Sequence, residues 1–194
     1  MLRAVIRHVG GIPGPIYGIQ GKQYIQQNIS GYNQAANYAP WLVIVDLDQD
    51  ASCPPPLRET WLPRPAPKMC FRVAVREIEA WLLADRMRIA DFFGVDSRSV
   101  PTDVEALPDP KHAVLQLARY SRWKAIREDM LPRIGSGRDV GPAYNSRLIQ
   151  FVTDSLRGWR PEVAARASES LRGCLRCLGR LAQETRHNPS STRQ

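Results

Sequence analysis

Three aspartates at alternate positions follow an apolar run in the segment VIVDLDQD: Asp46, Asp48 and Asp50. Where a strand continues, alternate residues project to the same side, so Asp46 and Asp48 would share a face, with Asp50 peripheral to them. Two adjacent carboxylates repel each other unless a cation lies between them. Mg²⁺ binds one or two carboxylates together with waters and substrate phosphates, so the spacing predicts a Mg²⁺ or Mn²⁺ site. The structural alternative is an acidic loop whose aspartates cap a turn.

A second acidic pair, Glu77 and Glu79, follows the apolar segment CFRVAV at the start of REIEAWLLAD. Carboxylates in the first turn of a helix interact favourably with the helix dipole, and that alone could explain the pair. If the two apolar segments are neighbouring parallel strands, however, both acidic pairs leave the sheet at its carboxyl edge, where ligands bind in open α/β sheets. A shared metal site is then possible.

The elements that must position these acids can be predicted from hydrophobic periodicity. Residues 41–45 (WLVIV) form a continuous apolar, β-branched run, which is typical of a buried strand in a parallel sheet. Residues 70–75 and the alternating segment 2–9 (LRAVIRHV) predict two further strands. In this part of the chain we expect helices over residues 22–38, 57–61 and 76–93.

After Pro101 the strand signals end, and Asp109 with Pro110 predicts the N-cap and first turn of a helix. Helices are expected over residues 111–120, 121–130, 144–156 and 168–184. The predicted fold class is therefore α/β with an all-helical, basic C-terminal extension. In this interpretation residues 1–100 form the α/β core, 101–184 form a helical extension packed on it, and 185–194 form a disordered tail.

The charge distribution favours a polyanionic partner. The chain has 27 basic and 19 acidic residues, and 16 of the basic residues but only seven of the acidic ones lie in residues 110–194. Such an excess is typical of nucleic-acid binding, although 23 of the 27 basic residues are arginines, which can also reflect genomic base composition. Trp123 in SRWK and Trp159 in RGWR could stack on bases, and packing between helices explains them equally well.

Several classes of protein are excluded by composition. No run approaches the roughly 20 apolar residues that a membrane span requires, and Arg3, Arg7 and His8 interrupt the place of a signal peptide. Four cysteines are too few for a disulfide scaffold in 194 residues. We therefore expect a cytoplasmic protein without a membrane partner, and we expect Cys174 and Cys177 to be buried free thiols rather than zinc ligands.

The two acidic motifs together resemble a Toprim-type domain, the metal-dependent catalytic module of topoisomerases, primases and OLD-family nucleases. More narrowly, the chain is similar to a family of small bacterial Toprim-like proteins linked to defence systems. Their apolar strand ends in Asp-x-Asp, matched by Asp46 and Asp48, and a later strand opens into a Glu-apolar-Glu helix, matched by EIEAWLL from Glu77 to Leu83. The resemblance covers about residues 1–95, with a looser likeness around Pro110, Lys111 and the GPAYN segment.

The resemblance implies a mostly parallel sheet flanked by helices, and magnesium-dependent cleavage of phosphodiester bonds. Asp46, Asp48 and Glu79 would bind the metal, and Glu77 would add a ligand or orient a metal-bound water. Two cations, Arg76 and Lys111, would neutralise charge on the phosphate. The implied partners are nucleic acid and a partner ATPase.

One feature departs from the family. A Toprim domain begins with a strand that ends in glutamate, whereas no acidic residue precedes Asp46. LRAVIRHV then corresponds to the second strand of the fold, and we expect the first strand and helix to be missing, through a misassigned start or a real loss. Such a chain would be catalytically incomplete, and its open sheet edge predicts self-association into a homo-oligomer.

Two alternatives to a nuclease remain. A non-catalytic or truncated Toprim-like module would bind nucleic acid or a protein partner without cleaving anything. A haloacid-dehalogenase-like phosphatase also has a strand that ends in Asp-x-Asp, with Asp46 as nucleophile and Asp48 as general acid. In that family a threonine usually stands where this chain has Asp50.

Overall fold

A pair of parallel strands carries the first acidic motif. In the computed structural model, which describes residues 1–17, 20–47, 54–75 and 77–187, β1 (Trp41–Asp46) pairs in parallel with β2 (Met69–Ala74). The register places Trp41 opposite Met69 and Asp46 opposite Ala74. Both strands and their parallel pairing agree with the sequence analysis, and the mixed α/β class is confirmed.

The chain divides into two compact units. The α/β unit comprises Leu2–Val75 and Ser170–Gln194, and the helical unit comprises Arg76–Glu169 together with Met1. The helical unit is therefore inserted between β2 and α10 (Glu169–His187) of the α/β unit. The sequence-based division at residue 100 remains a prediction, and in the structure the boundaries between the two units lie after Val75 and after Glu169.

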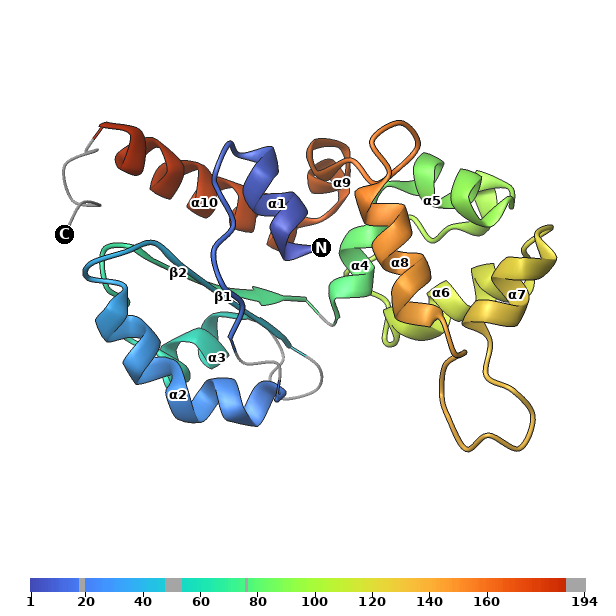
Figure 1. The fold of residues 1–194 in the computed structure, drawn as a ribbon, viewed down its shortest axis with the longest axis horizontal. Coiled ribbons are helices and arrows are strands. Elements are labelled where there is room, and N and C mark those ends of the chain that lie inside the picture. Colours follow the sequence, from blue (N-terminus) through green and yellow to red (C-terminus); the bar gives the residue numbers. More distant parts are fainter. Residues whose placement is uncertain (18–19, 48–53, 76, 188–194) are drawn as a thin grey trace. The chain divides into compact units, whose positions relative to one another are not determined.

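Two helices cover one face of the sheet in the α/β unit: α2 (Lys22–Ala35) and α3 (Pro54–Trp61) (Figure 1). Alternate strand residues point to this face, where they pack against apolar side chains of both helices. The core on this side contains Val43, Val45, Phe71 and Val73 of the strands, Ile29 of α2 and Leu57 of α3.

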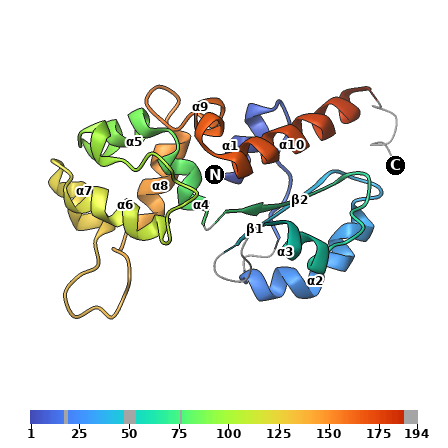
Figure 2. The same cartoon turned by 180° about the vertical axis from the view of Figure 1, so that it is seen from behind.

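The opposite face of the sheet is covered by α1 (Leu2–His8) and α10 (Figure 2). Cys70 of β2 forms a disulfide with Cys177 of α10, with 6.0 Å between their Cα atoms. Cys174 is buried and free. The expectation of a free thiol is thus confirmed for Cys174 and wrong for Cys177, because β2 brings Cys70 against the helix.

The expected strand over residues 2–9 is wrong, because residues 2–8 form α1. Leu2, Val5, Ile6 and Val9 recur at the i, i+3, i+4, i+7 spacing of a helix face, and Val5 is fully buried. Arg7 and His8 lie in the last turn, where positive charge interacts favourably with the helix dipole. The apolar residues are therefore buried by a helix, although their imperfect alternation with polar residues also fits a strand.

An apolar groove of about 830 Å³ runs beside β1 in the α/β unit. Its lining includes Trp41 to Ile44 of β1, the segment from Gly10 to Tyr17 and Leu181 of α10. Ile12 is 95% exposed. Among the described residues, β1 pairs with β2 alone, and the groove borders β1.

Arg72 of β2 carries one unsatisfied buried donor. Its Nε atom has no hydrogen-bond partner among the residues that the structure describes, and burial together with the positive charge of Arg58 lowers the pKa of Arg72. We expect Arg72→Met to raise the free energy of unfolding by about 1–3 kcal/mol, because an unsatisfied buried donor is removed while the aliphatic stem stays. Chemical denaturation checks this, with the exposed Arg172→Met of α10 as control. A less stable Arg72→Met variant would show that the guanidinium contributes to folding.

The helical unit contains two helices in a segment where the sequence predicted one. Residues 76–93 were expected to be continuous, but α4 (Ile78–Leu83) and α5 (Arg86–Phe93) are separated at Ala84 and Asp85. The break places the Asp85 carboxylate against Arg160, which donates to it from its backbone N and from its guanidinium. The predicted burial of Trp81 is confirmed.

The remaining helices of this unit follow their local signals. Asp109 caps α6 (Pro110–Arg119) by accepting from the backbone N of His112 at 2.6 Å, as expected. Two other expected helices are shorter than predicted, namely α7 (Lys124–Met130) and α8 (Tyr144–Thr153), and a 3₁₀ turn covers Ser97–Ser99. One more helix, α9 (Pro161–Ala167), was not predicted, although Pro161 at its first turn is a known start signal.

Candidate functional site

The first acidic motif lies at the carboxyl end of β1. Asp46 is its last residue and is half-buried, opposite Ala74 in the parallel register. Near this end the Lys22 ammonium donates to the backbone O of Leu47 at 3.3 Å. Asp48, Asp50 and Arg76 lie outside the described residues. Of the first acidic motif, the structure therefore describes Asp46 alone.

The second acidic motif is part of a polar cluster within the helical unit, which we call the Glu–Lys–Tyr cluster: Glu77, Glu79, Lys111 and Tyr144. The backbone N of Lys111 donates to Glu77 Oε2 at 2.9 Å, and its Nζ lies 3.4 Å from Glu77 Oε1. The Tyr144 hydroxyl donates to Glu79 Oε1 at 3.1 Å. Three residues predicted from the sequence are therefore brought together, and Tyr144 is added to them.

Local sequence explains how each helix presents its member of the cluster. The Asp109–Pro110 pair starts α6, so the backbone N–H of Lys111 lies in the first turn, has no partner within the helix and can bond to Glu77. Glu77 is the N-cap of α4, which places Glu79 in the first turn of that helix. The carboxylates and the amide donor thus come from two adjoining helix starts.

Tyr144 is positioned by the GPAYN segment. Gly141 donates to Met130 O at 2.8 Å, and Ala143 donates to Asp129 O at 2.9 Å. A Cβ at Gly141 would overlap the backbone of residues 129–131, so glycine is required for this close approach. α8 begins directly afterwards at Tyr144, whose side chain is buried. The sequence analysis noted GPAYN as part of the resemblance but assigned Tyr144 no role.

The electrostatics of the cluster are dominated by burial. Glu79 is only 8% exposed, and desolvation together with the negative charge of Glu77 raises its pKa. Burial and the charge of Glu79 raise the pKa of Tyr144, so its hydroxyl stays a donor. Burial opposes the charge of Lys111, but the attraction of Glu77 and Glu79 is larger and raises its pKa overall. Additional positive charge near Glu79 would stabilise its carboxylate.

The cluster contains carboxylate oxygens, the type of donor that hard divalent cations use. Within the described ranges no group of three or more His, Cys, Asp or Glu side chains could hold a metal ion. The cluster supplies two carboxylates, and Mg²⁺ needs only one or two because waters and phosphates complete its coordination. Both oxygens of Glu77 already interact with Lys111, so Glu79 is the better candidate ligand.

The two tryptophans in basic segments have different environments. Trp159 is buried, and its Nε1 donates to the backbone O of Trp81 at 2.9 Å, so it serves packing and cannot stack on a base. Trp123 is 47% exposed, with the guanidinium carbon of Arg122 lying 4.4 Å from the ring centroid. Trp123 therefore keeps the capacity to stack.

Comparisons with known proteins give no match. No family model matches the chain, and neither a curated protein nor a solved structure matches it. Across the described residues, no helix has both the length and the apolar character needed to cross a bilayer. A functional assignment therefore has to come from the residues and their geometry.

Proposed function

We propose that this chain is a Toprim-like, metal-dependent protein that cleaves phosphodiester bonds. The observation that carries the proposal is the grouping of Glu77, Glu79 and Lys111, three residues named from the sequence, in one polar cluster in which Glu79 is buried and the other two are partly exposed. Carboxylates beside a lysine are groups that phosphoryl chemistry uses. The basic balance of the chain fits a phosphodiester substrate.

Each residue of the cluster has a proposed role. Glu79 binds Mg²⁺ or Mn²⁺, and the ion, when bound, supplies Lewis-acid polarisation of the phosphate. Glu77 orients water through its carboxylate, and Lys111 neutralises charge on the phosphate oxygens. Tyr144 is a positioning residue, because its hydroxyl fixes the orientation of Glu79. Asp46 and Asp48 remain proposed metal ligands at the end of β1, and Arg76 remains a proposed phosphate contact.

Metal binding is the first test of this proposal. We expect calorimetric titration with Mn²⁺ or Mg²⁺ to show binding to the wild-type chain and at least about tenfold weaker binding to Asp46→Ala/Asp48→Ala, because two hard oxygen ligands are lost. Glu128→Gln is a suitable control, since this glutamate is exposed on α7 and pairs only with Lys124 at 3.4 Å among the described residues. Equal binding by the double variant would remove Asp46 and Asp48 from the proposal.

A non-catalytic module is the second candidate. It is favoured by the Lys111–Glu77 contacts, which satisfy Glu77 without a metal and would stabilise the helical unit by themselves. This candidate predicts nucleic-acid or protein binding with no cleavage by the wild-type chain in Mn²⁺. The partner ATPase and self-association remain predictions, and sedimentation velocity would measure the latter.

A further inference from the structure

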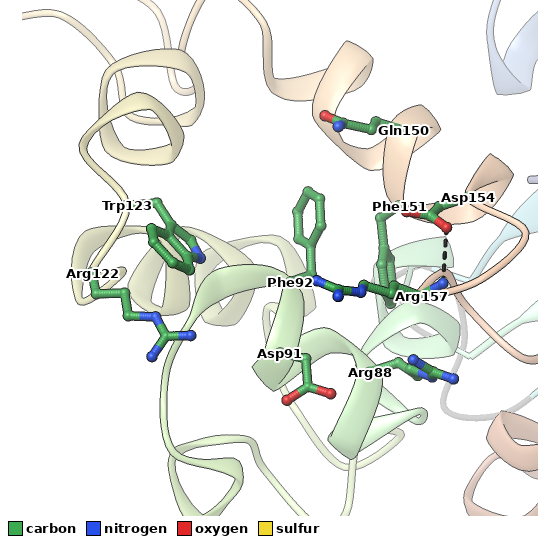
Figure 3. Close-up of a pocket in the computed structure, with 9 residues that line it drawn as sticks. All are labelled: Arg88, Asp91, Phe92, Arg122, Trp123, Gln150, Phe151, Asp154 and Arg157. Atoms are coloured by element: carbon green, nitrogen blue, oxygen red, sulfur yellow. Dashed lines mark hydrogen bonds between the residues drawn. The ribbon is translucent and has the colours of Figure 1, made fainter.

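A pocket of about 360 Å³ in the helical unit combines arginines with aromatic rings (Figure 3). Its volume lies within the range of about 300–1,000 Å³ that small-ligand sites occupy. The residues come from α5, from the segment before α7, and from α8 and the turn after it. The lining consists of Arg88, Asp91, Phe92, Arg122, Trp123, Gln150, Phe151, Asp154 and Arg157.

The arginine side chains of the pocket have hydrogen-bond donors that could bind a ligand. In the part of the chain that the structure describes, the guanidinium groups of Arg88, Arg122 and Arg157 form no ion pair within 4.0 Å. Each guanidinium carries five N–H donors in a planar arrangement that matches phosphate oxygens. Three such groups around one cavity favour an anionic ligand.

One carboxylate of the lining, Asp154, forms its hydrogen bonds with backbone groups rather than with these guanidinium groups. Asp154 accepts backbone N–H bonds from Leu156 and Arg157, each at 2.8 Å, and these bonds lower its pKa (Figure 3 marks the contact with Arg157). Its Oδ1 atom is therefore engaged by the turn that follows α8. The other carboxylate of the lining, Asp91, is exposed. Three arginines and two aspartates give the lining a net charge of +1.

Aromatic rings provide the apolar part of the lining. Trp123 is about half exposed, and Phe92 packs against the buried Phe151 with ring centroids 5.1 Å apart. In Figure 3 the Trp123 and Phe92 rings lie on either side of open space, and the Arg157 guanidinium extends toward Phe92. An exposed tryptophan beside arginines is typical of platforms on which nucleobases stack.

The end of α5 fixes this platform in place. Gly94 ends the helix with φ +63°, a left-handed conformation that favours glycine. A Cβ at Gly94 would lie 2.7 Å from Arg122 Cγ and 2.7 Å from Trp123 Nε1. The glycine therefore both terminates α5 and allows the Arg122–Trp123 pair to pack against its end.

We propose that this pocket binds one base-plus-phosphate unit of single-stranded nucleic acid, with the base on Trp123 and the phosphate on Arg88, Arg122 and Arg157. A single strand is favoured over a duplex because a base must leave its stack to lie on the tryptophan. A free nucleotide offers the same base-plus-phosphate chemistry, so a comparison of strand lengths with a mononucleotide distinguishes the two ligands. The inference goes beyond the proposed function, since it needs neither metal nor cleavage.

The test is fluorescence anisotropy of labelled single-stranded DNA and RNA in the presence of EDTA, so that failure of binding is distinguishable from failure of cleavage. Stacking contributes about 1–3 kcal/mol per base, so Trp123→Ala should weaken binding about 5- to 150-fold. Arg157→Gln should reduce the slope of log K against log salt by about 0.7, the value for one single-strand phosphate. Arg98→Gln is the control, because Arg98 is exposed in the same unit and pairs with Asp96.

Three outcomes decide the proposal. Loss of affinity in Trp123→Ala with an unchanged melting temperature supports it, as does a preference for single strands over duplex. A mononucleotide that binds through Trp123 as tightly as a longer strand supports base stacking and phosphate binding in the pocket. That result assigns the site to a free nucleotide and overturns the assignment to a strand. Wild-type affinity in both Trp123→Ala and Arg157→Gln, or losses no larger than that of Arg98→Gln, would overturn it.

Discussion

Arg160→Met should lower the free energy of unfolding by about 3–5 kcal/mol, because it leaves a buried carboxylate without its counterion. The Asp85 side chain is 0% exposed, and its oxygens accept from Arg160 N at 3.0 Å, Nε at 2.9 Å and Nη2 at 2.7 Å. Methionine preserves much of the aliphatic packing and removes both guanidinium donors. Of the three hydrogen bonds that Arg160 donates to the Asp85 carboxylate, the variant would keep the one from the backbone N of residue 160.

Chemical denaturation of the single and double variants measures this effect. The double variant Asp85→Asn/Arg160→Met should be less destabilised than the two single variants added together, since it buries no unpaired charge. Lys124→Met serves as control, because Lys124 forms an exposed i,i+4 pair with Glu128 whose loss should not be measurable. A small effect of Arg160→Met, comparable to that of the control, would show that the Asp85 carboxylate does not depend on this partner.

Glu79→Gln should lower the rate of metal-dependent cleavage about 10²-fold or more, while making the metal-free chain more stable at neutral pH. The amide oxygen of glutamine can still accept the Tyr144 hydrogen bond, so the geometry of the cluster is retained. The substitution removes a charge that burial and Glu77 disfavour, and with it the proposed metal ligand. Cleavage and stability should therefore change in opposite directions.

The pH dependence of stability provides an independent measurement on the same variant. Because the pKa of Glu79 is raised above its ordinary 4.5 in the folded state, the folded chain holds this proton more tightly than the unfolded chain does. Protonation of Glu79 therefore contributes fully to the free energy of unfolding below pH 4.5, and this contribution is lost as the pH rises through the raised pKa. Glu79→Gln should lack this loss in denaturation series at several pH values, whereas Glu128→Gln should keep it. Identical profiles for Glu79→Gln and wild type would contradict the argument.

Local signals were sufficient to predict some elements and not others. β1 could be predicted because WLVIV is continuous and β-branched, and the start of α6 because Asp109 and Pro110 give an unambiguous cap. The segment 2–9 was wrongly assigned because a short apolar pattern satisfies both the strand and the helix period, and burial of Val5 decides between them. The break at Asp85 depends on Arg160, 75 residues away, which no local pattern indicates.

In the candidate site, too, local motifs could be predicted from the sequence, whereas contacts between distant residues could not. Glu77 and Glu79 could be named because their motif is local, and Lys111 because the family resemblance extends loosely to Pro110 and Lys111. Tyr144 contacts Glu79 across 65 residues, so only the folded chain reveals it. The Cys70–Cys177 disulfide spans 107 residues, and cysteine pairing cannot be deduced from sequence spacing.

The insertion of the helical unit also constrains the order in which the protein can fold during synthesis. β2 leaves the ribosome before the helical unit, whereas α10, which covers one face of the sheet, follows it. Domains generally fold as units while the chain is being made. The helical unit can therefore complete its core first, and until α10 emerges the nascent sheet exposes apolar surface to chaperones.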